Sequence, residues 1–486
     1  MIRSFGAGLL MTFLLAACYK VGPDYQHPEV ELPRQWRFGQ AHQGVQPSLD
    51  AYWWRRFKDP VLERLIDTAV QRNLDLNQAV ARVEQFMGTY GSVRSLLLPQ
   101  IMGAANVSKI YNADNQIGLS GGTTTDAGDV NFARMGGGLE WEIDVWGQLR
   151  RAKESARAEL LSQEAVRRAI LLTVVTEVAL TYIQLRLQDA DLEITRSLVS
   201  TLENELRIAT SRFNEGYSSE LDLNQVQSEY HRRAAFIPKY EKAIAETEHA
   251  LCLLLGQSPG PIPRGRTLEE LEPLEVPRGL PGDLLRQRPD IQKAEQDLIA
   301  ANARIGVALG EYFPKIILTG DAGQATAQLS TMFTPGANFW ALGSGLVMPI
   351  FTAGKIAGRV QAAEGKTGEA LASYQESVLT AMKEVEDALV GRTKNLAQLD
   401  QESSRVKATE SYFRLSRLRY DEGYTDYLTV LDSLRQLFDA RIEQAEIKTL
   451  ALASSVRIYR AMGGGWIEGA EASLAVPKPR EATFFP

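Results

Sequence analysis

The side chains that most often perform chemistry are few in this 486-residue chain, and they are not grouped. The four histidines are His27, His42, His231 and His249. None forms a pair at the spacing of metal ligands. Neither triple-glycine segment, 136–138 or 463–465, precedes the Lys-Ser/Thr of a phosphate-binding loop. We therefore expect no enzyme activity, no metal site and no cofactor.

Three carboxylates alternate along one short segment, at Glu140, Glu142 and Asp144. Apolar residues occupy the positions between them, so a β-strand here would have one acidic face and one apolar face. The acidic face suits the wet lumen of a channel better than it suits acid–base catalysis. We predict that these three side chains face a lumen, with a half-buried soluble sheet as the alternative.

The overall charge and hydropathy exclude two classes of protein. With 53 Lys and Arg against 60 Asp and Glu, the chain carries a net charge of −7, so we expect no nucleic-acid partner. No uninterrupted apolar run approaches the ~20 residues of a membrane-spanning helix, which excludes a polytopic helical membrane protein. A transmembrane β-barrel stays possible, because its strands alternate in polarity.

The first eighteen residues have the form of an export signal. A positive start at Arg3 precedes an apolar core, 9–17, which is too short to span a membrane. Small residues directly before Cys18 resemble the lipobox of bacterial lipoproteins, which implies that 1–17 is a signal peptide and that Cys18 is lipidated. Tyr19 then implies sorting to the outer membrane. The alternative is a plain signal peptide. One acyl anchor binds weakly, so the lipid is expected to be an auxiliary tether.

The chain contains an internal duplication. Residues 212–217 (RFNEGY) match residues 419–424 (RYDEGY) at an offset of 207, and further matches upstream have an offset of 215. The order of the matches is the same in both halves, so we predict two structural repeats. The difference of eight residues implies a longer hairpin in the first copy.

The two repeats predict the same order of elements. A signal peptide, 1–17, and a lipidated, extended N-terminal segment, 18–59, are expected first. The first repeat, 60–263, should contain a helix from Leu74 to Leu98, a β-hairpin at 100–146, a long helix at 147–215 and a helix at 219–256. The second repeat, 264–466, should contain a helix at 290–313, a β-hairpin at 315–352, a long helix at 354–422 and a helix at 425–462, followed by an irregular tail, 467–486.

Both long helices are predicted from an apolar residue at every seventh position, a spacing that Arg392 alone interrupts in the second copy. About 65 helical residues reach ~100 Å. The shorter helices of each repeat together have nearly the same length, so we expect them to stack end to end beside the long helix. Pro238 is expected to kink the helix at 219–256.

Four alternating strands cannot close a barrel, and open sheet edges cannot lie in lipid. Two chains would give eight strands with a filled interior, whereas three chains give twelve strands and room for a lumen. The predicted fold class is therefore α+β: a transmembrane β-barrel with four strands per chain and twelve per trimer, continued by a long periplasmic α-helical barrel, with an internal duplication.

Several motifs resemble the outer membrane factor family, the TolC/OprM-like ducts of tripartite efflux pumps, in its lipoprotein branch. They are the lipobox, VGPDY at 21–25, the two RxxEGY turns and LTVLD at 428–432. The resemblance implies a homotrimer in bacterial outer-membrane lipid that extends into the periplasm. It also implies docking to a periplasmic adaptor and an inner-membrane pump, for which we expect the RND type. The implied function is passive exit of drugs and other small toxic compounds.

The resemblance also implies a periplasmic gate at Leu428, Asp432 and Arg435, with Tyr420 nearby. The i, i+4, i+7 spacing of the first three places them on one helical face. The hypothesis is that Asp–Arg contacts and a leucine ring close the mouth; an ordinary i, i+3 ion pair is the alternative. The turn residues that are candidates for adaptor contact are Gly216, Tyr217, Gly423 and Tyr424.

Two other functions stay open on the sequence alone. One is a duct for type I protein secretion, since the family hosts both uses. The other is a lipid-anchored periplasmic coiled-coil scaffold without a pore, which would share the lipobox and the seven-residue repeats. A scaffold would not need an apolar outward face on all four strands.

Overall fold

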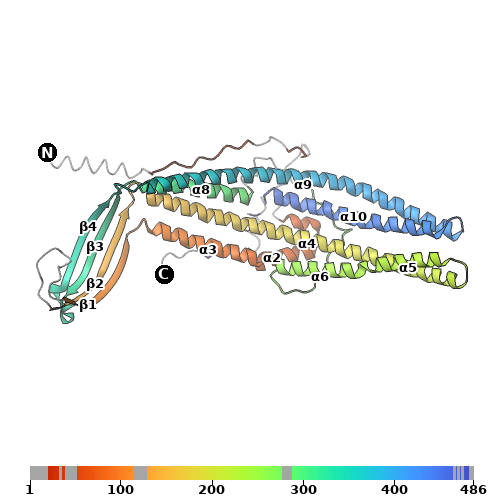
Figure 1. The fold of residues 1–486 in the computed structure, drawn as a ribbon, viewed down its shortest axis with the longest axis horizontal. Helices are drawn as coiled ribbons and strands as arrows, with labels where there is room; N and C mark the ends of the chain where they lie inside the picture. The colour runs from red at the N-terminus through yellow and green to blue at the C-terminus, as the bar shows by residue number, and fades with distance from the viewer. Residues whose placement is uncertain are drawn as a thin grey trace.

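The computed structural model describes residues 20–31, 36–38, 52–112, 128–275, 287–463, 467, 471 and 475–480. Within them the chain is elongated, with a curved β-sheet at one end and long helices that run away from it (Figure 1). The predicted signal peptide and Cys18 lie outside the described residues.

The elements of the first repeat are α3 (Leu74–Ser95), β1 (Gln100–Asn112), β2 (Gly128–Ile143), α4 (Gln148–Asn214), α5 (Glu220–Ala234) and α6 (Phe236–Leu254). The elements of the second repeat are α8 (Pro289–Gly310), β3 (Lys315–Thr326), β4 (Asn338–Val347), α9 (Lys355–Asp421) and α10 (Tyr427–Ala461), with the short 3₁₀ turns η2 (Leu329–Thr331) and η3 (Pro335–Ala337) between β3 and β4. Each long helix has 67 residues, which corresponds to ~100 Å.

The element boundaries confirm the duplication. Both ends of α3 map onto the ends of α8 at an offset of 215, and both ends of α4 map onto the ends of α9 at 207. Three glycine pairs at the offset of 207 share the left-handed conformation, with φ between 64° and 85°: Gly147 and Gly354, Gly216 and Gly423, Gly256 and Gly463. Because L-residues avoid this conformation, glycine fixes the same turns in both copies.

The single helix predicted at 219–256 is wrong, because the structure has two helices, α5 and α6, that meet at Ala235. Pro238 has no N–H to donate to the carbonyl of Ala234, which is the last residue of α5. The break therefore falls just before the proline, which lies in the first turn of α6. In the second copy Ala445 occupies the matching position, and α10 is unbroken.

Two elements before the first repeated helix were not predicted. They are η1 (Trp53–Phe57), inside the segment expected to be extended, and α2 (Pro60–Arg72). Asp59 caps α2 by accepting hydrogen bonds from the N–H groups of Val61 and Leu62, and a proline at the first helical position is favourable. Trp53 and Trp54 are fully buried in a cluster that includes residues of α4 and α10.

The short helices stack end to end beside the long ones, as predicted, and one residue joins each stack. Asn73 accepts a hydrogen bond from Leu76 N at the start of α3 and donates one to the carbonyl of Leu254 at the end of α6. In the second copy Arg288 precedes α8 and donates to the carbonyl of Ala461, at the end of α10, over 2.7 Å. Each contact satisfies helix-end carbonyls that would otherwise lack partners.

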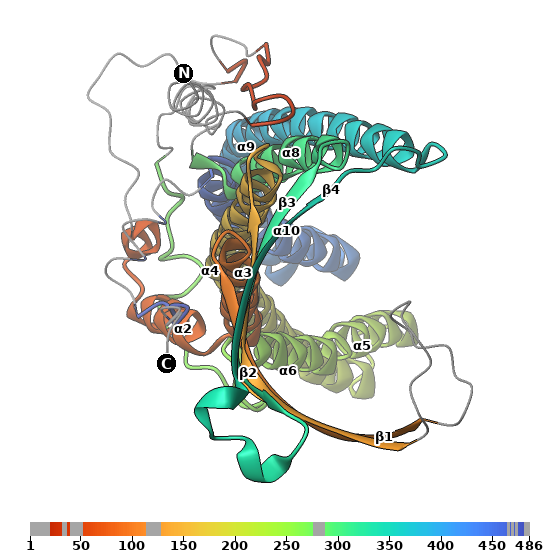
Figure 2. The same ribbon diagram turned by 90° about the vertical axis from the view of Figure 1, so that its left-hand side faces the viewer.

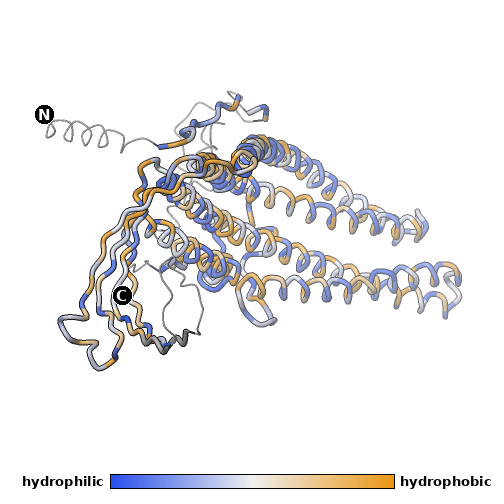
Figure 3. Tube along the Cα trace, turned by 60° about the vertical axis from the view of Figure 1, so that its left-hand side comes forward, coloured by the Kyte–Doolittle hydropathy of each residue, from blue (hydrophilic) through white to orange (hydrophobic). Residues whose placement is uncertain are grey.

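The described strands form one antiparallel sheet in the order β1-β2-β3-β4. Figure 2 shows the sheet as an arc, seen nearly along the helices. Figure 3 shows polar and apolar residues interleaved along the strands and the helices. One window of α4 is apolar enough to cross a membrane, but 67% of it is buried inside the protein. That burial is typical of a core helix.

Candidate functional site: channel wall and gate

The two turns at the far tips of the helices have the same backbone geometry. At the α4–α5 turn, Tyr217 N donates to Arg212 O over 2.8 Å, and at the α9–α10 turn Tyr424 N donates to Arg419 O over the same distance. Gly216 and Gly423 supply the positive φ that this helix ending requires. Tyr217 and Tyr424 are 80% and 72% exposed, so the two tyrosines among the four predicted contact residues lie open to solvent at the tip.

Tyr420 links the ends of the two long helices. Its hydroxyl accepts a hydrogen bond from Arg212 Nη1 of α4 over 2.5 Å, and the Arg212 guanidinium lies over its ring. Its other neighbour is Tyr427, the first residue of α10, edge-to-face at 5.4 Å. Tyr420 therefore connects the α9–α10 hairpin to the α4–α5 hairpin.

Arg435 connects the same two hairpins through Glu229. Its Nε donates to Glu229 Oε2 over 2.9 Å, and Arg232 and Arg233 of α5 hold the other oxygen of the same carboxylate. Burial tends to raise the pKa of Glu229, but the hydrogen bonds from Arg233 and Arg435 outweigh it and lower that pKa. Glu229 is therefore both buried and ionised, and its ion pairs hold α5 against α10.

Asp432 and Leu428 face solvent within the chain. Leu428 is 49% exposed. Asp432 accepts a hydrogen bond from Gln436 over 2.8 Å and a weak one, at 3.5 Å, from the Tyr412 hydroxyl of α9. The described residues contain no ion pair between Asp432 and Arg435, so the simple i, i+3 pair is absent. The two side chains instead join α10 to different neighbours.

The register of the sheet separates an acidic face from an apolar one. On one face, Arg134 and Asp321 form an ion pair at 3.1 Å across β2 and β3. Glu140 lies on that face, and so does Glu142, which pairs with Lys315. Both glutamates therefore occupy the polar face that the sequence predicted.

The prediction that Asp144 lies on the acidic face of the strand is wrong. β2 ends at Ile143, so Asp144 is not a strand residue. Its carboxylate accepts hydrogen bonds from Leu149 N and Arg150 N, in the first turn of α4. The physical reason is that Gly147, at the start of α4, has no side chain that could cap the helix.

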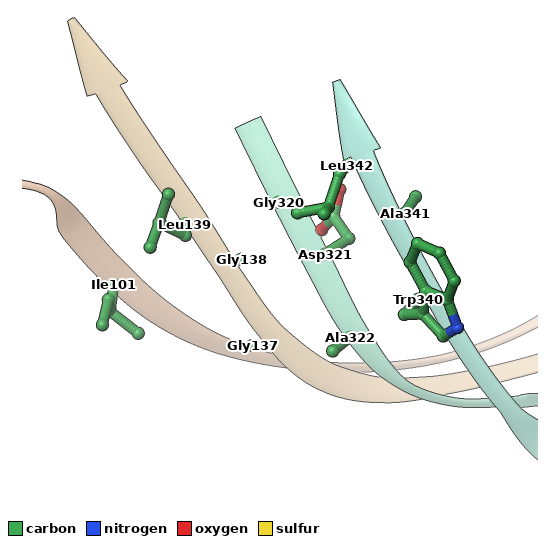
Figure 4. Close-up of a pocket in the computed structure, with 10 residues that line it drawn as sticks. All are labelled: Ile101, Gly137, Gly138, Leu139, Gly320, Asp321, Ala322, Trp340, Ala341 and Leu342. Carbon is green, nitrogen blue, oxygen red and sulfur yellow. The ribbon is translucent and has the colours of Figure 1, made fainter. Parts of the chain in front are cut away.

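The opposite face of the sheet is apolar and exposed. Its large side chains include Ile101, Leu139, Trp340 and Leu342. Figure 4 shows these residues around the glycines of neighbouring strands, where they surround a shallow depression of about 550 Å³. Leu342 is 80% exposed and Trp340 78%. An apolar face of this kind suits contact with lipid.

Sequence reasoning did not identify Glu229 and Arg212, the partners of two gate candidates. The only available signal was the position of Glu229, one turn before two arginines. The described residues contain no group of three or more His, Cys, Asp or Glu side chains that could hold a metal ion. The candidate site thus consists of a sheet with one polar and one apolar face, and of a helical tip in which Tyr420 and Arg435 connect two hairpins.

Comparisons with known proteins agree with this geometry. A family model described as outer membrane efflux protein matches residues 65–257 and 280–464. The solvent efflux pump outer membrane protein SrpC of Pseudomonas putida is 35% identical over 459 residues, which cover 93% of this chain and 96% of the relative. The probable outer membrane lipoprotein SilC of Salmonella typhimurium is 29% identical over 94% of this chain and 97% of its own.

Solved channels share the fold. The CmeC outer membrane channel of Campylobacter jejuni matches with a TM-score of 0.85 and 25% identity, over 92% of this chain and 95% of that one. The open-state MtrE outer membrane channel of Neisseria gonorrhoeae matches with a TM-score of 0.80 and 28% identity, over 92% and 98% of the two chains.

Proposed function

The chain belongs to the outer membrane efflux protein family, and from that premise we propose how it works as an efflux channel of the outer membrane. Three chains form one tube, with the acidic sheet face toward the lumen and the apolar face toward lipid. The observation that carries this proposal is the open, two-faced sheet of four strands, because its edge strands β1 and β4 need partners in a membrane.

The proposed partners follow from what a passive tube lacks. The sequence contains no phosphate-binding motif, so energy must come from an inner-membrane pump, which we propose is of the RND type, through a periplasmic adaptor. The exposed turns at Tyr217 and Tyr424 are the proposed adaptor contacts. The proposed cargo is the class for which relatives are named, small organic molecules such as solvents and toluene.

The gate is proposed at the helical tip. Leu428 and Asp432 face solvent in one chain and would meet their copies near the three-fold axis. Arg435 and Tyr420 hold the α9–α10 hairpin against the α4–α5 hairpin, so breaking their contacts would let the inner mouth widen. Ion pairs between two packed hairpins suit a gate, because the charged side chains can exchange partners when the helices shift from a closed to an open arrangement.

We expect the double variant Asp432→Ala with Arg435→Ala to leak. Removing both side chains frees α10 from Tyr412 of α9 and from Glu229 of α5, so single-channel conductance in planar bilayers and vancomycin entry into cells should both rise several-fold. The matched control is Gln225→Ala with Ser228→Ala, which alters the corresponding positions of the first copy. Equal leakiness in wild type and double variant would remove these residues from the gate.

A further inference from the structure

The buried apolar side chains between α4 and α10 form two clusters, which only partly buried apolar side chains connect. On α4, one buried apolar cluster extends to Leu187, and another begins at Leu198. On α10, the cluster near the tip ends at Phe438, and the cluster near the middle begins at Ala445. Between these limits only partly buried apolar side chains continue the packing: Ile194 contacts both clusters, and Ile442 contacts the one near the tip. We call the two clusters the middle core and the tip core.

Four buried oxygen atoms in or beside the region between the two cores have no hydrogen-bond partner among the described residues. They are Gln188 Oε1, Asp191 Oδ1, Thr195 Oγ1 and Thr449 Oγ1, which we call the polar seam. The three α4 residues lie on one helical face by their spacing. Asp191 is 5% exposed and Thr195 is fully buried. Helical threonines elsewhere in the chain, such as Thr201, donate to a carbonyl one turn back.

The charged and titratable groups that face Asp191 come from two other helices. They are Glu446 of α10, with Lys239 and Tyr240 of α6. Burial, followed by the charge of Glu446, raises the pKa of Asp191 to about 7, and Lys239 opposes this shift. Burial also raises the pKa of Tyr240, with Asp191 and Glu446 as the next causes.

The dimensions of the seam favour a proton over a metal ion. Residues 188–195 extend ~10 Å along α4, whereas an oxygen-bound cation reaches ligands at only about 2–2.6 Å. A single ion could not satisfy all four oxygens. A protonated carboxyl needs no such shell, and it lowers the cost of burying the group.

We propose that the seam is a pH-sensitive hinge between the middle core and the tip core. Asp191 holds its proton while α10 is fully packed on α4, and release of that proton to water beside the exposed Glu446 loosens this packing. α10 is one unbroken helix, so a shift at Glu446 is carried ~20 Å to Asp432. Tyr240 also lies within electrostatic reach of Arg233, which belongs to the Glu229 link.

The direction of the pH dependence follows from proton binding. The ordinary value for the carboxyl is 3.8, and the folded value is about 7. Between these values the folded state binds more protons than the unfolded state, so stability falls as the pH rises through this window. Above the folded value the full penalty of the buried charge is present.

The test compares Asp191→Asn, which cannot ionise, with Glu193→Gln, which removes an equal charge from an exposed position on α4. The apparent Tm of the purified full-length protein is measured at about pH 5.5 and about pH 8.5, on either side of the folded value. We expect wild type and Glu193→Gln to melt lower at the higher pH, and Asp191→Asn to lose most of that difference. An equal Tm shift in all three proteins would overturn the proposal.

A second measurement is the infrared difference spectrum between the wild-type protein and Asp191→Asn. The band of a protonated carboxylic acid should be stronger in the wild-type protein at the lower pH and equal in the two proteins at the higher one; the lack of any difference at the lower pH would contradict the proposal. Only the coupling to conductance rests on the proposed channel. The Tm could differ between the two pH values only in the proteins that retain Asp191, while conductance does not change with pH. That result would support the hinge as a determinant of stability and would refute its coupling to the gate.

Discussion

The variant Leu342→Arg is expected to disappear from the outer-membrane fraction. Leu342 lies in the middle of β4 on the apolar face and is 80% exposed. A charged side chain on the lipid face near the bilayer centre costs about 2–4 kcal/mol, and a trimer would carry this cost three times. The measurement is immunoblotting of separated membrane fractions, together with assembly on gels.

The neighbouring variant Ala341→Arg is the matched control. Ala341 is directly opposite Asp321 in the register, on the face that carries the ion pairs. A new arginine there would face water and acidic side chains, so membrane insertion should be normal. If both variants inserted equally well, or if both failed, the assignment of the two faces would be wrong.

The variant Glu229→Ala is expected to open the tip and to destabilise it. Glu229 is buried, and Arg233, which it pairs with at 2.8 Å, is buried as well. Removing one partner of a buried ion pair costs about 3–5 kcal/mol, because the other charge stays without compensation. We expect a lower Tm and a several-fold rise in conductance, measured on the same purified protein.

The control for this variant is Glu241→Ala, which removes another interhelical pair, with Arg196, in an exposed position. Exposed pairs contribute about 0–1 kcal/mol, so stability and conductance should stay close to wild type.

The pKa of Glu229 is lowered from 4.5. The link therefore stabilises the fold above that value and is lost only as the pH falls through the lower, folded value. The wild-type channel should therefore be closed at neutral pH and become leaky only in acid. A wild-type channel that leaked at neutral pH and not in acid would contradict this role of Glu229.

The repeats, the long helices and the two faces of the sheet could be predicted because each leaves a periodic signal. A period of two defines the faces of β2, and the offset of 207 aligns the turns at Gly216 and Gly423. The break before Pro238 could be anticipated but not placed, since the choice between residues 234 and 238 depends on backbone hydrogen bonds. Such local geometry has no period.

Contacts between distant segments could not be predicted. Arg392 interrupts the seven-residue apolar pattern, and the structure gives the reason: its guanidinium donates to the carbonyl of Leu274, in a loop more than a hundred residues away. The same holds for the pairing of Arg435 with Glu229, for which one sequence offers no spacing rule. Asp144 was assigned to the strand because alternation alone does not mark where a strand ends.

The most direct test of the account is the mass of the intact particle in mild detergent. We predict three chains per particle, measured by light scattering with correction for bound detergent, and a conducting pore from the same preparation. A stable single chain that remains soluble in water once any lipid has been removed would contradict the account, since four strands with an apolar face could not then be a third of a membrane-spanning wall.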